Sequence, residues 1–128
     1  MQKDYLKWTK IKKVVHNEKP RVFFKVREVW FCHLGENVGF EQDGRGEQFL
    51  RPIIVLKKFN KELFWGIPLT KNQKIGKYYH NFNLNGNIST AILSQFRLID
   101  AKRLKYKIGD ISDAVLLEIK TKIRQFLA

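Results

Sequence analysis

The chain has 128 residues, of which 44% are hydrophobic and 13% aromatic, so a single folded domain is expected and a disordered tail is excluded. Its 25 Lys and Arg residues exceed its 12 Asp and Glu residues, a net charge of +13 that favours a polyanionic partner, nucleic acid before an anionic membrane. No apolar run approaches the roughly 20 residues of a membrane span, and the single cysteine excludes a disulfide framework, so we expect a cytoplasmic protein.

The first predicted element is an amphipathic helix over residues 3–16. Its apolar side chains lie at helical spacing, at Tyr5, Trp8, Ile11 and Val15. Lysines occupy most of the other positions around this helix. Residues 1–26 carry eight basic and two acidic side chains, a net charge of +6.

Strands are predicted from Arg21 onward. The segment up to Gly35 is aromatic and β-branched, and residues 51–59 contain the aliphatic run Ile53–Leu56, which is typical of a strand buried on both faces. Between these segments, residues 36–48 carry four acidic side chains and one arginine, a net charge of −3. We expect an acidic loop here, inside an otherwise basic protein.

The next predicted feature is a hairpin with a tight turn centred on Asn60-Lys61. Antiparallel pairing around this turn brings Arg51 opposite Thr70, and a single bulge would shift the pairing by one residue. A guanidinium beside a hydroxyl at the open end of a hairpin can bind a phosphate. The structural alternative is an edge arginine that only marks where the strand begins.

Further strands are predicted in residues 77–82 and 88–100, on either side of an Asn-Gly turn at Asn85. Residues 101–104 predict one helical turn, and residues 105–109 predict a last short strand.

A closing helix is predicted after Ser112 or Asp113, either of which can cap it. Its apolar stripe consists of Val115, Leu116, Ile119, Ile123, Phe126 and Leu127. Several short strands followed by one helix indicate an α+β domain built on a small, strongly bent sheet or partial barrel.

Metal and thiol chemistry are not expected. Cys32 and His33 are adjacent on a predicted strand, so their side chains point to opposite faces. His16 and His80 lie in unrelated contexts, and no spacing matches a zinc pattern. We therefore predict no metal, no cofactor and no Cys–His nucleophile, with a buried thiol and partly exposed imidazoles.

A basic segment follows Thr70 directly. Lys71, Lys74 and Lys77, followed by Tyr78, combine cations that can neutralise phosphates with an aromatic ring on which a base can stack. This combination suits single-stranded nucleic acid. A solvated loop is the alternative interpretation.

Four segments together resemble the MazF/PemK family of ribosome-independent endoribonuclease toxins. They are REVWFCHLGENVGFEQ, RPIIVL, IPLT and ILSQFRLIDAKRL, and they occur in the order found in that family. The resemblance covers roughly residues 27–127. It divides the chain into an N-terminal basic helical extension, residues 1–26, and a toxin domain, residues 27–128.

The resemblance implies a small SH3-like antiparallel β-barrel with a C-terminal helix, to which this chain adds an N-terminal helix. It also implies a cytoplasmic homodimer that is neutralised by an antitoxin and has no membrane partner. The implied activity is metal-independent, sequence-selective cleavage of single-stranded RNA. The 2′-hydroxyl attacks the adjacent phosphate and leaves a 2′,3′-cyclic phosphate and a 5′-hydroxyl.

The family pattern also implies site residues. Its catalytic arginine and threonine fall on Arg51 and Thr70, and we expect Glu41 to act as the general base. Gln42, from the same loop, and Gln95, from a later strand, are expected to bind RNA. The lysines and tyrosine of residues 71–78 complete the predicted RNA-binding set.

Two features depart from the family pattern. Residues 43–50 separate the Glu-Gln pair from Arg51, where the family usually has only a few residues. Ile92 and Ser94 stand where one branch of the family has Arg and Asp. The alternatives are a non-catalytic barrel that binds RNA or a partner protein, and a gyrase-directed toxin of the same fold.

Overall fold

The computed structural model describes residue 7, residues 22–34 and residues 50–128. Apart from residue 7, the predicted N-terminal helix lies outside the described residues. The acidic loop, with Glu41 and Gln42, also lies outside them.

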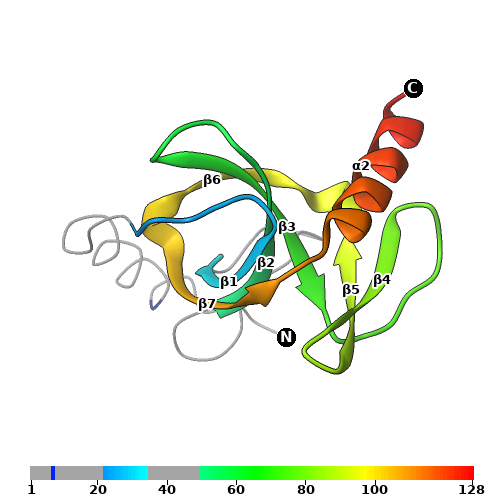
Figure 1. The fold of residues 1–128 in the computed structure, drawn as a ribbon, viewed down its shortest axis with the longest axis horizontal. Helices are drawn as coiled ribbons and strands as arrows, with labels where there is room; N and C mark the ends of the chain where they lie inside the picture. The colour runs from blue at the N-terminus through cyan, green and yellow to red at the C-terminus, as the bar shows by residue number, and fades with distance from the viewer. Residues whose placement is uncertain (1–6, 8–21, 35–49) are drawn as a thin grey trace.

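The described residues form an antiparallel half-barrel with a C-terminal helix (Figure 1). The strands are β1 (Glu28–His33), β2 (Leu50–Lys58), β3 (Leu63–Thr70), β4 (Tyr79–Leu84), β5 (Asn87–Ile92), β6 (Arg97–Asp100) and β7 (Leu104–Asp110). Two short 3-10 helices, η1 (Leu93–Gln95) and η2 (Ala101–Arg103), flank β6, and α2 (Asp113–Leu127) ends the chain. The α+β class and the closing helix were predicted correctly.

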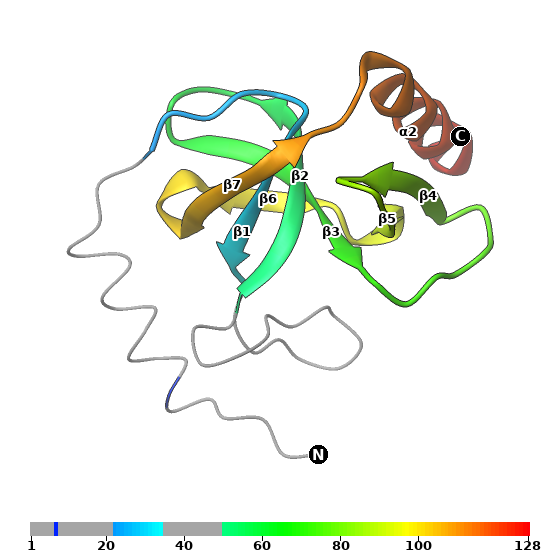
Figure 2. The ribbon, with the colours of Figure 1, turned by 60° about the horizontal axis from the view of Figure 1, so that its bottom comes forward.

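The sheet runs in the order β4-β5-β3-β2-β1-β7, and β6 pairs with β3 away from this path. β5 pairs with the end of β3, whereas β6 pairs with its beginning. Figure 2 shows the consequence: the β4–β5 hairpin projects from the half-barrel, and α2 lies beside it.

Two predicted strands are shorter than expected. The first begins at Glu28 rather than Arg21, because Arg27 adopts a left-handed backbone conformation with φ of 78° that interrupts an extended chain. The segment predicted as one strand over residues 88–100 is divided by η1. This division follows from the pairing, since the chain must step from one end of β3 to the other between β5 and β6.

The β2–β3 hairpin has the predicted turn. Its tip is fixed by Asn60, whose side-chain Oδ1 accepts hydrogen bonds from the N–H groups of Glu62 and Leu63, each at 2.8 Å. Ile53 pairs with Pro68 in the predicted register, and a bulge beyond Val55 shifts the pairs nearer the turn by one residue.

The aliphatic run of β2 is buried on both faces, as predicted. Ile54 and Leu56 belong to the cluster that packs against α2. Ile53 and Val55 point to a second cluster inside the half-barrel. One strand therefore contributes to both cores.

The C-terminal helix is capped by Ser112, whose Oγ accepts a hydrogen bond from Val115 N at 3.1 Å. Its buried side chains are Leu116, Ile119 and Ile123. Leu127, which we expected in the apolar stripe, is 67% exposed because the helix extends beyond the sheet surface at its last turn.

The imidazoles differ from expectation. Cys32 is buried as predicted, but His33 and His80 are buried too rather than partly exposed. His80 faces α2, where its Nε2 lies 3.0 Å from Glu118 Oε2. Burial lowers the pKa of His80 below its ordinary value, and the nearby Lys122 lowers it further, while Glu118 opposes both.

Neither a membrane-spanning helix nor a metal-binding group is found in the part of the chain that the structure describes. No helix there is long and apolar enough to cross a membrane. No group of three or more His, Cys, Asp or Glu side chains in the same residues could hold a metal ion.

Candidate functional site

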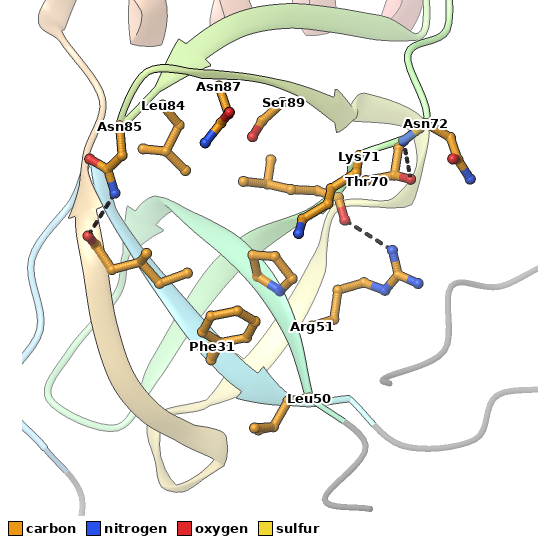
Figure 3. Close-up of a pocket in the computed structure, with 13 residues that line it drawn as sticks. Phe31, Leu50, Arg51, Thr70, Lys71, Asn72, Leu84, Asn85, Asn87 and Ser89 are labelled. Atoms are coloured by element: carbon orange, nitrogen blue, oxygen red, sulfur yellow. Dashed lines mark hydrogen bonds between the residues drawn. The ribbon is translucent and has the colours of Figure 1, made fainter. Parts of the chain in front are cut away.

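A cavity of about 600 Å³ lies at the open end of the β2–β3 hairpin, between the half-barrel and the β4–β5 hairpin (Figure 3). Its apolar lining comes from Phe31, Leu50, Pro52, Leu69, Leu84 and Ile108. Its polar lining comes from Arg51, Thr70, Lys71, Asn72, Asn85, Asn87 and Ser89. An apolar cavity with a polar rim is the usual form of a ligand site.

Arg51 is fixed at one end of this cavity. It is only 4% exposed, and its Nη1 donates a hydrogen bond to the carbonyl of Leu69 at 2.9 Å. On β2 it shares a face with Ile53, because alternate side chains of a strand point the same way. A guanidinium in so little water exerts a stronger field than one in bulk solvent.

Thr70 lies at the same cavity but is not paired with Arg51 as the hairpin prediction supposed. Backbone pairing between β2 and β3 ends at Ile53 and Pro68, and Thr70 pairs with Thr90 of β5. The strands separate here because Pro68 has no N–H to donate and the end of β3 turns toward β5. The Arg51 side chain bridges the gap to β3 instead.

The hydroxyl of Thr70 is oriented by the chain that follows it. Its Oγ1 accepts a hydrogen bond from Asn72 N at 3.2 Å. A hydroxyl has one proton to donate as well as two lone pairs, so this contact leaves the O–H proton available. Thr70 can therefore donate to a ligand in the cavity.

The three lysines of residues 71–78 differ in their position relative to the cavity. Lys71 lines the cavity, whereas Lys74, Lys77 and Tyr78 are in the same loop but are not part of the lining. The Tyr78 ring packs edge-on against Phe126 of α2, at 5.1 Å between ring centroids, and lies 5.0 Å from Lys77 Nζ. Tyr78 is 39% exposed, so part of its ring stays accessible for stacking.

Of the remaining predicted residues, the structure describes only Gln95, and it is not at the cavity. Gln95 lies in η1 rather than in a strand, because that helix connects β5 to β6. It is absent from the cavity lining. Glu41 and Gln42 lie outside the described residues. Arg51, Thr70 and Lys71 are therefore the predicted residues that the fold brings together.

Several lining residues were missed by the sequence reasoning. Phe31 comes from β1, and Asn87 and Ser89 come from β5. Residues 77–82 were predicted as a strand and Asn85 as part of a turn, whereas Phe31, Asn87 and Ser89 were given no role in the site. Cross-strand pairing places Asn87 and Ser89 on the same face as Leu84, and this face closes the cavity, whereas Asn81 and Asn83 lie on the other face. Alternation along the sequence therefore gave no signal for these lining residues.

Residues 25–127 match a protein family described as PemK-like, MazF-like toxin of type II toxin-antitoxin system. The match covers most of the chain, including every strand of the sheet and all of α2. A search among curated protein sequences finds no match.

Solved structures share the fold. A MazF crystal structure from Deinococcus radiodurans has a TM-score of 0.67 and 19% identity, covering 87% of this chain and 98% of that one. An endoribonuclease from a Mycobacterial species, in complex with its cognate antitoxin, has a TM-score of 0.62 and 11% identity, covering 82% and 95%. MazE-MazF from Deinococcus radiodurans has a TM-score of 0.60 and 18% identity, covering 88% and 98%.

Proposed function

Because the chain belongs to the PemK-like, MazF-like toxin family of type II toxin–antitoxin systems, we propose that it is an endoribonuclease toxin whose active site is the cavity at the open end of the β2–β3 hairpin. The observation that carries this proposal is Arg51, a buried guanidinium held at the cavity by the Leu69 carbonyl, with Thr70 in the same lining. Family membership supplies the reaction class, and the geometry supports the residues.

The reaction that fits these groups is attack by an RNA 2′-hydroxyl on the adjacent phosphate. The 2′-oxygen loses its proton and forms a bond to phosphorus, while the bond from phosphorus to the 5′-oxygen breaks. The 5′-oxygen leaves with the bonding electron pair and takes a proton from water, so the products are a 2′,3′-cyclic phosphate and a 5′-hydroxyl. Negative charge accumulates on the phosphoryl oxygens in the transition state. Arg51 stabilises that charge electrostatically, and its fixed position means that little reorganisation is needed.

Thr70 donates a second hydrogen bond to the phosphate. Its hydroxyl proton remains available while Asn72 N–H occupies one lone pair. Both charge stabilisation and hydrogen bonding then come from protein side chains, and we assign no metal and no cofactor to the reaction. Glu41 is proposed as the base that removes the 2′-proton.

RNA binding involves the surface around the cavity. Lys71 lies in the lining, and Lys74, Lys77 and Tyr78 extend the basic surface along the same loop. We assign further RNA contacts to Gln42 and Gln95. The substrate is single-stranded RNA, because its unstacked bases can reach side chains that a duplex would exclude.

The proposed assembly is a homodimer of the toxin domain, residues 27–128, with residues 1–26 as a basic extension. Its partner is a cognate antitoxin protein, and the site of action is the cytoplasm. The structural relatives support the partner, since one is an endoribonuclease solved with its cognate antitoxin and another is a MazE-MazF structure.

The test is product analysis on a defined single-stranded RNA in buffer with EDTA. We expect fragments that end in a 2′,3′-cyclic phosphate and begin with a 5′-hydroxyl. A control RNA with a 2′-deoxy nucleotide at the cleavage position should stay intact, because it lacks the nucleophile. RNA that is bound but never cut would reject the nuclease and indicate a binding module. Stabilised DNA breaks in a gyrase assay, without RNA products, would indicate a gyrase-directed toxin.

A further inference from the structure

The polar residues opposite Phe31 distinguish this cavity from a simple phosphate site. Asn87 and Ser89 project from β5 toward the cavity, and Phe31 lies on the other side of it (Figure 3). The apolar lining also includes Leu84 and Pro52, the residue that pairs with Phe31 across the two strands. A phosphate gains nothing from an aromatic ring and aliphatic surface, whereas a nucleobase can pack against both.

The asparagines of the β4–β5 hairpin are used in different ways. Asn81 and Asn83 hold backbone groups, the Lys74 carbonyl at 3.1 Å and the Gly86 N–H at 3.0 Å. Asn85 Nδ2 donates to the carbonyl of Ile108 at 3.2 Å and so ties the turn to β7. These three side chains are structural.

Asn87 and Ser89 differ from them. Within residues 22–34 and 50–128, the Asn87 amide and the Ser89 hydroxyl have no side-chain hydrogen-bond partner. Both residues line the cavity. An amide presents a donor and an acceptor next to each other, and a hydroxyl presents one of each. Their unused hydrogen-bonding groups are aimed at a space that no side chain of the described fold fills.

A nucleobase can interact with both sides of the cavity, the Phe31 ring on one side and the polar groups of Asn87 and Ser89 on the other. Proteins recognise unstacked bases by stacking them on an aromatic ring and hydrogen-bonding their edges. Phe31 is half-buried, and its ring centroid lies 5.0 Å from that of Tyr106, a contact that helps to hold the Phe31 ring in place. The volume of about 600 Å³ accommodates a base together with its ribose.

We propose that the cavity holds one nucleobase of the RNA, stacked against Phe31 and read at its edge by Asn87 and Ser89. This inference rests on the proposed nuclease function, because Arg51 in the same lining then contacts a phosphate next to that base. Asn87 and Ser89 are specificity-determining residues, and Phe31 is the stacking platform. The cavity thereby links the choice of sequence to the position of the cut.

The experiment measures binding and cleavage separately. Binding is followed by fluorescence anisotropy. The RNAs carry a 2′-deoxy nucleotide at the cleavage position, so that they cannot be cut. In a series of such RNAs, each position next to the cleavage site carries in turn one of the four bases or an abasic residue. Wild-type protein should prefer one base at one position and bind the abasic RNA about tenfold to one-hundredfold more weakly, the usual effect of losing a stacked base.

The variants are Asn87→Ala, Ser89→Ala, their double variant and Phe31→Leu. In the double variant, the ratio of the affinity for the preferred base to that for the other bases should fall by about tenfold or more, while RNA binding itself is retained. Phe31→Leu should reduce the difference between base-bearing and abasic RNA. Gln125→Ala is the matched control, because it removes an exposed amide on α2 outside the cavity. If Phe31→Leu fails to fold, Asn87→Ala and Ser89→Ala still test the base pocket, because neither residue is buried in the core.

The outcomes separate this inference from the proposed function. If the wild-type protein cuts RNA and the double variant cuts with the same site preference, the base pocket is wrong and the nuclease stands. If the wild-type protein cuts no RNA but shows a base preference that the double variant loses, the pocket stands and the nuclease is wrong. If RNA binding shows no preference for any base or for base over abasic residue, the pocket is wrong.

Discussion

Two basic side chains at opposite ends of β2 make the same kind of contact in different surroundings. Arg51 Nη1 donates to the carbonyl of Leu69 at 2.9 Å, and Lys58 Nζ donates to the carbonyl of Phe24 at 2.7 Å. Lys58 also lies 4.4 Å from the ring of Phe24 and 4.7 Å from the ring of Phe23. Arg51 instead lines the cavity.

The comparison shows that a hydrogen bond to a carbonyl does not by itself identify a functional cation. The fold provides partners for Lys58, since the rings of Phe23 and Phe24 attract its charge and the Phe24 carbonyl accepts a hydrogen bond from its ammonium group. Arg51 is oriented by its carbonyl and faces a space that can hold a ligand. Both residues donate a hydrogen bond to a carbonyl, so this contact does not distinguish them. The cavity beside Arg51 is what distinguishes it, as the proposed catalytic residue, from the structural Lys58.

The largest expected effect is the loss of cleavage in Arg51→Ala. Removing one preorganised group that stabilises transition-state charge should lower the single-turnover rate by about two to three orders of magnitude. RNA affinity should fall much less, because Arg51 is one cation among several. Single-turnover cleavage and melting temperature should be measured on the same preparations.

Arg51→Lys is the control for folding. Lysine keeps a positive charge and can donate to the Leu69 carbonyl, but it lacks the planar fork of donors that a phosphate binds. We expect a stable protein with little recovered activity. Wild-type cleavage by a folded Arg51 variant would reduce Arg51 to a structural residue like Lys58.

The next largest effect concerns the exposed cations of the β3–β4 loop. Replacing Lys71, Lys74 and Lys77 with Gln should weaken binding to all RNA sequences alike. Because each phosphate contact to a single strand contributes roughly 0.7 to the slope of log affinity against log salt, the slope should change by about 2. The measurement is a salt titration of binding. An unchanged slope would show that these lysines are solvated and do not contact RNA phosphates.

The reciprocal prediction concerns Lys58→Met, which removes the ammonium and keeps an apolar chain of similar size. The free energy of unfolding should fall by about 1–3 kcal/mol, because the Phe24 carbonyl loses its charged donor. Urea denaturation measures this loss. Lys61→Met, at an exposed position in the turn, should leave stability almost unchanged.

Cleavage per folded molecule should not change in Lys58→Met. The reason is position, since Lys58 lies at the closed end of the hairpin and Arg51 at the open end. A selective loss of cleavage in this variant would remove the distinction between the two cations.

The smallest effect comes from a third basic side chain, His80, which faces Glu118 and Lys122 of α2. Burial keeps its folded-state pKa below 6.5, so protons bind more readily to the unfolded chain in that range. The contribution to stability is therefore complete above about pH 6.5 and is lost as the pH falls through the lowered pKa.

His80→Gln should weaken this pH dependence. The measurement is the urea midpoint of both proteins between about pH 8 and about pH 5.5. Parallel curves for the two proteins would show that His80 titrates alike in the folded and unfolded chains.

Much of the fold follows from local pattern. The buried run of β2, the Asn60 turn and a helix cap at Ser112 or Asp113 were predicted because neighbouring residues specify them, and Ser112 proves to be the cap. The family resemblance is confirmed by the match over residues 25–127. The roles of Arg51 and Thr70 remain predictions, although both residues line the cavity.

The failures have a common origin. The division of residues 88–100 by η1 depends on which part of β3 is free to pair with each strand. The burial of His80 depends on α2, which begins more than thirty residues later. The separation of Thr70 from Arg51 depends on β5. None of these partners can be read from the residues next to the one they affect.

The sequence by itself determined the β2–β3 hairpin with its turn, the closing helix and the basic character of the chain, because these depend on side-chain periodicity and charge within short segments. Only the tertiary structure decided the composition of the cavity. Phe31, Arg51, Thr70 and Asn87 come from four different strands, and their proximity is set by antiparallel pairing across the sheet. Periodicity can assign a residue to a face, but the pairing of distant strands determines which faces meet.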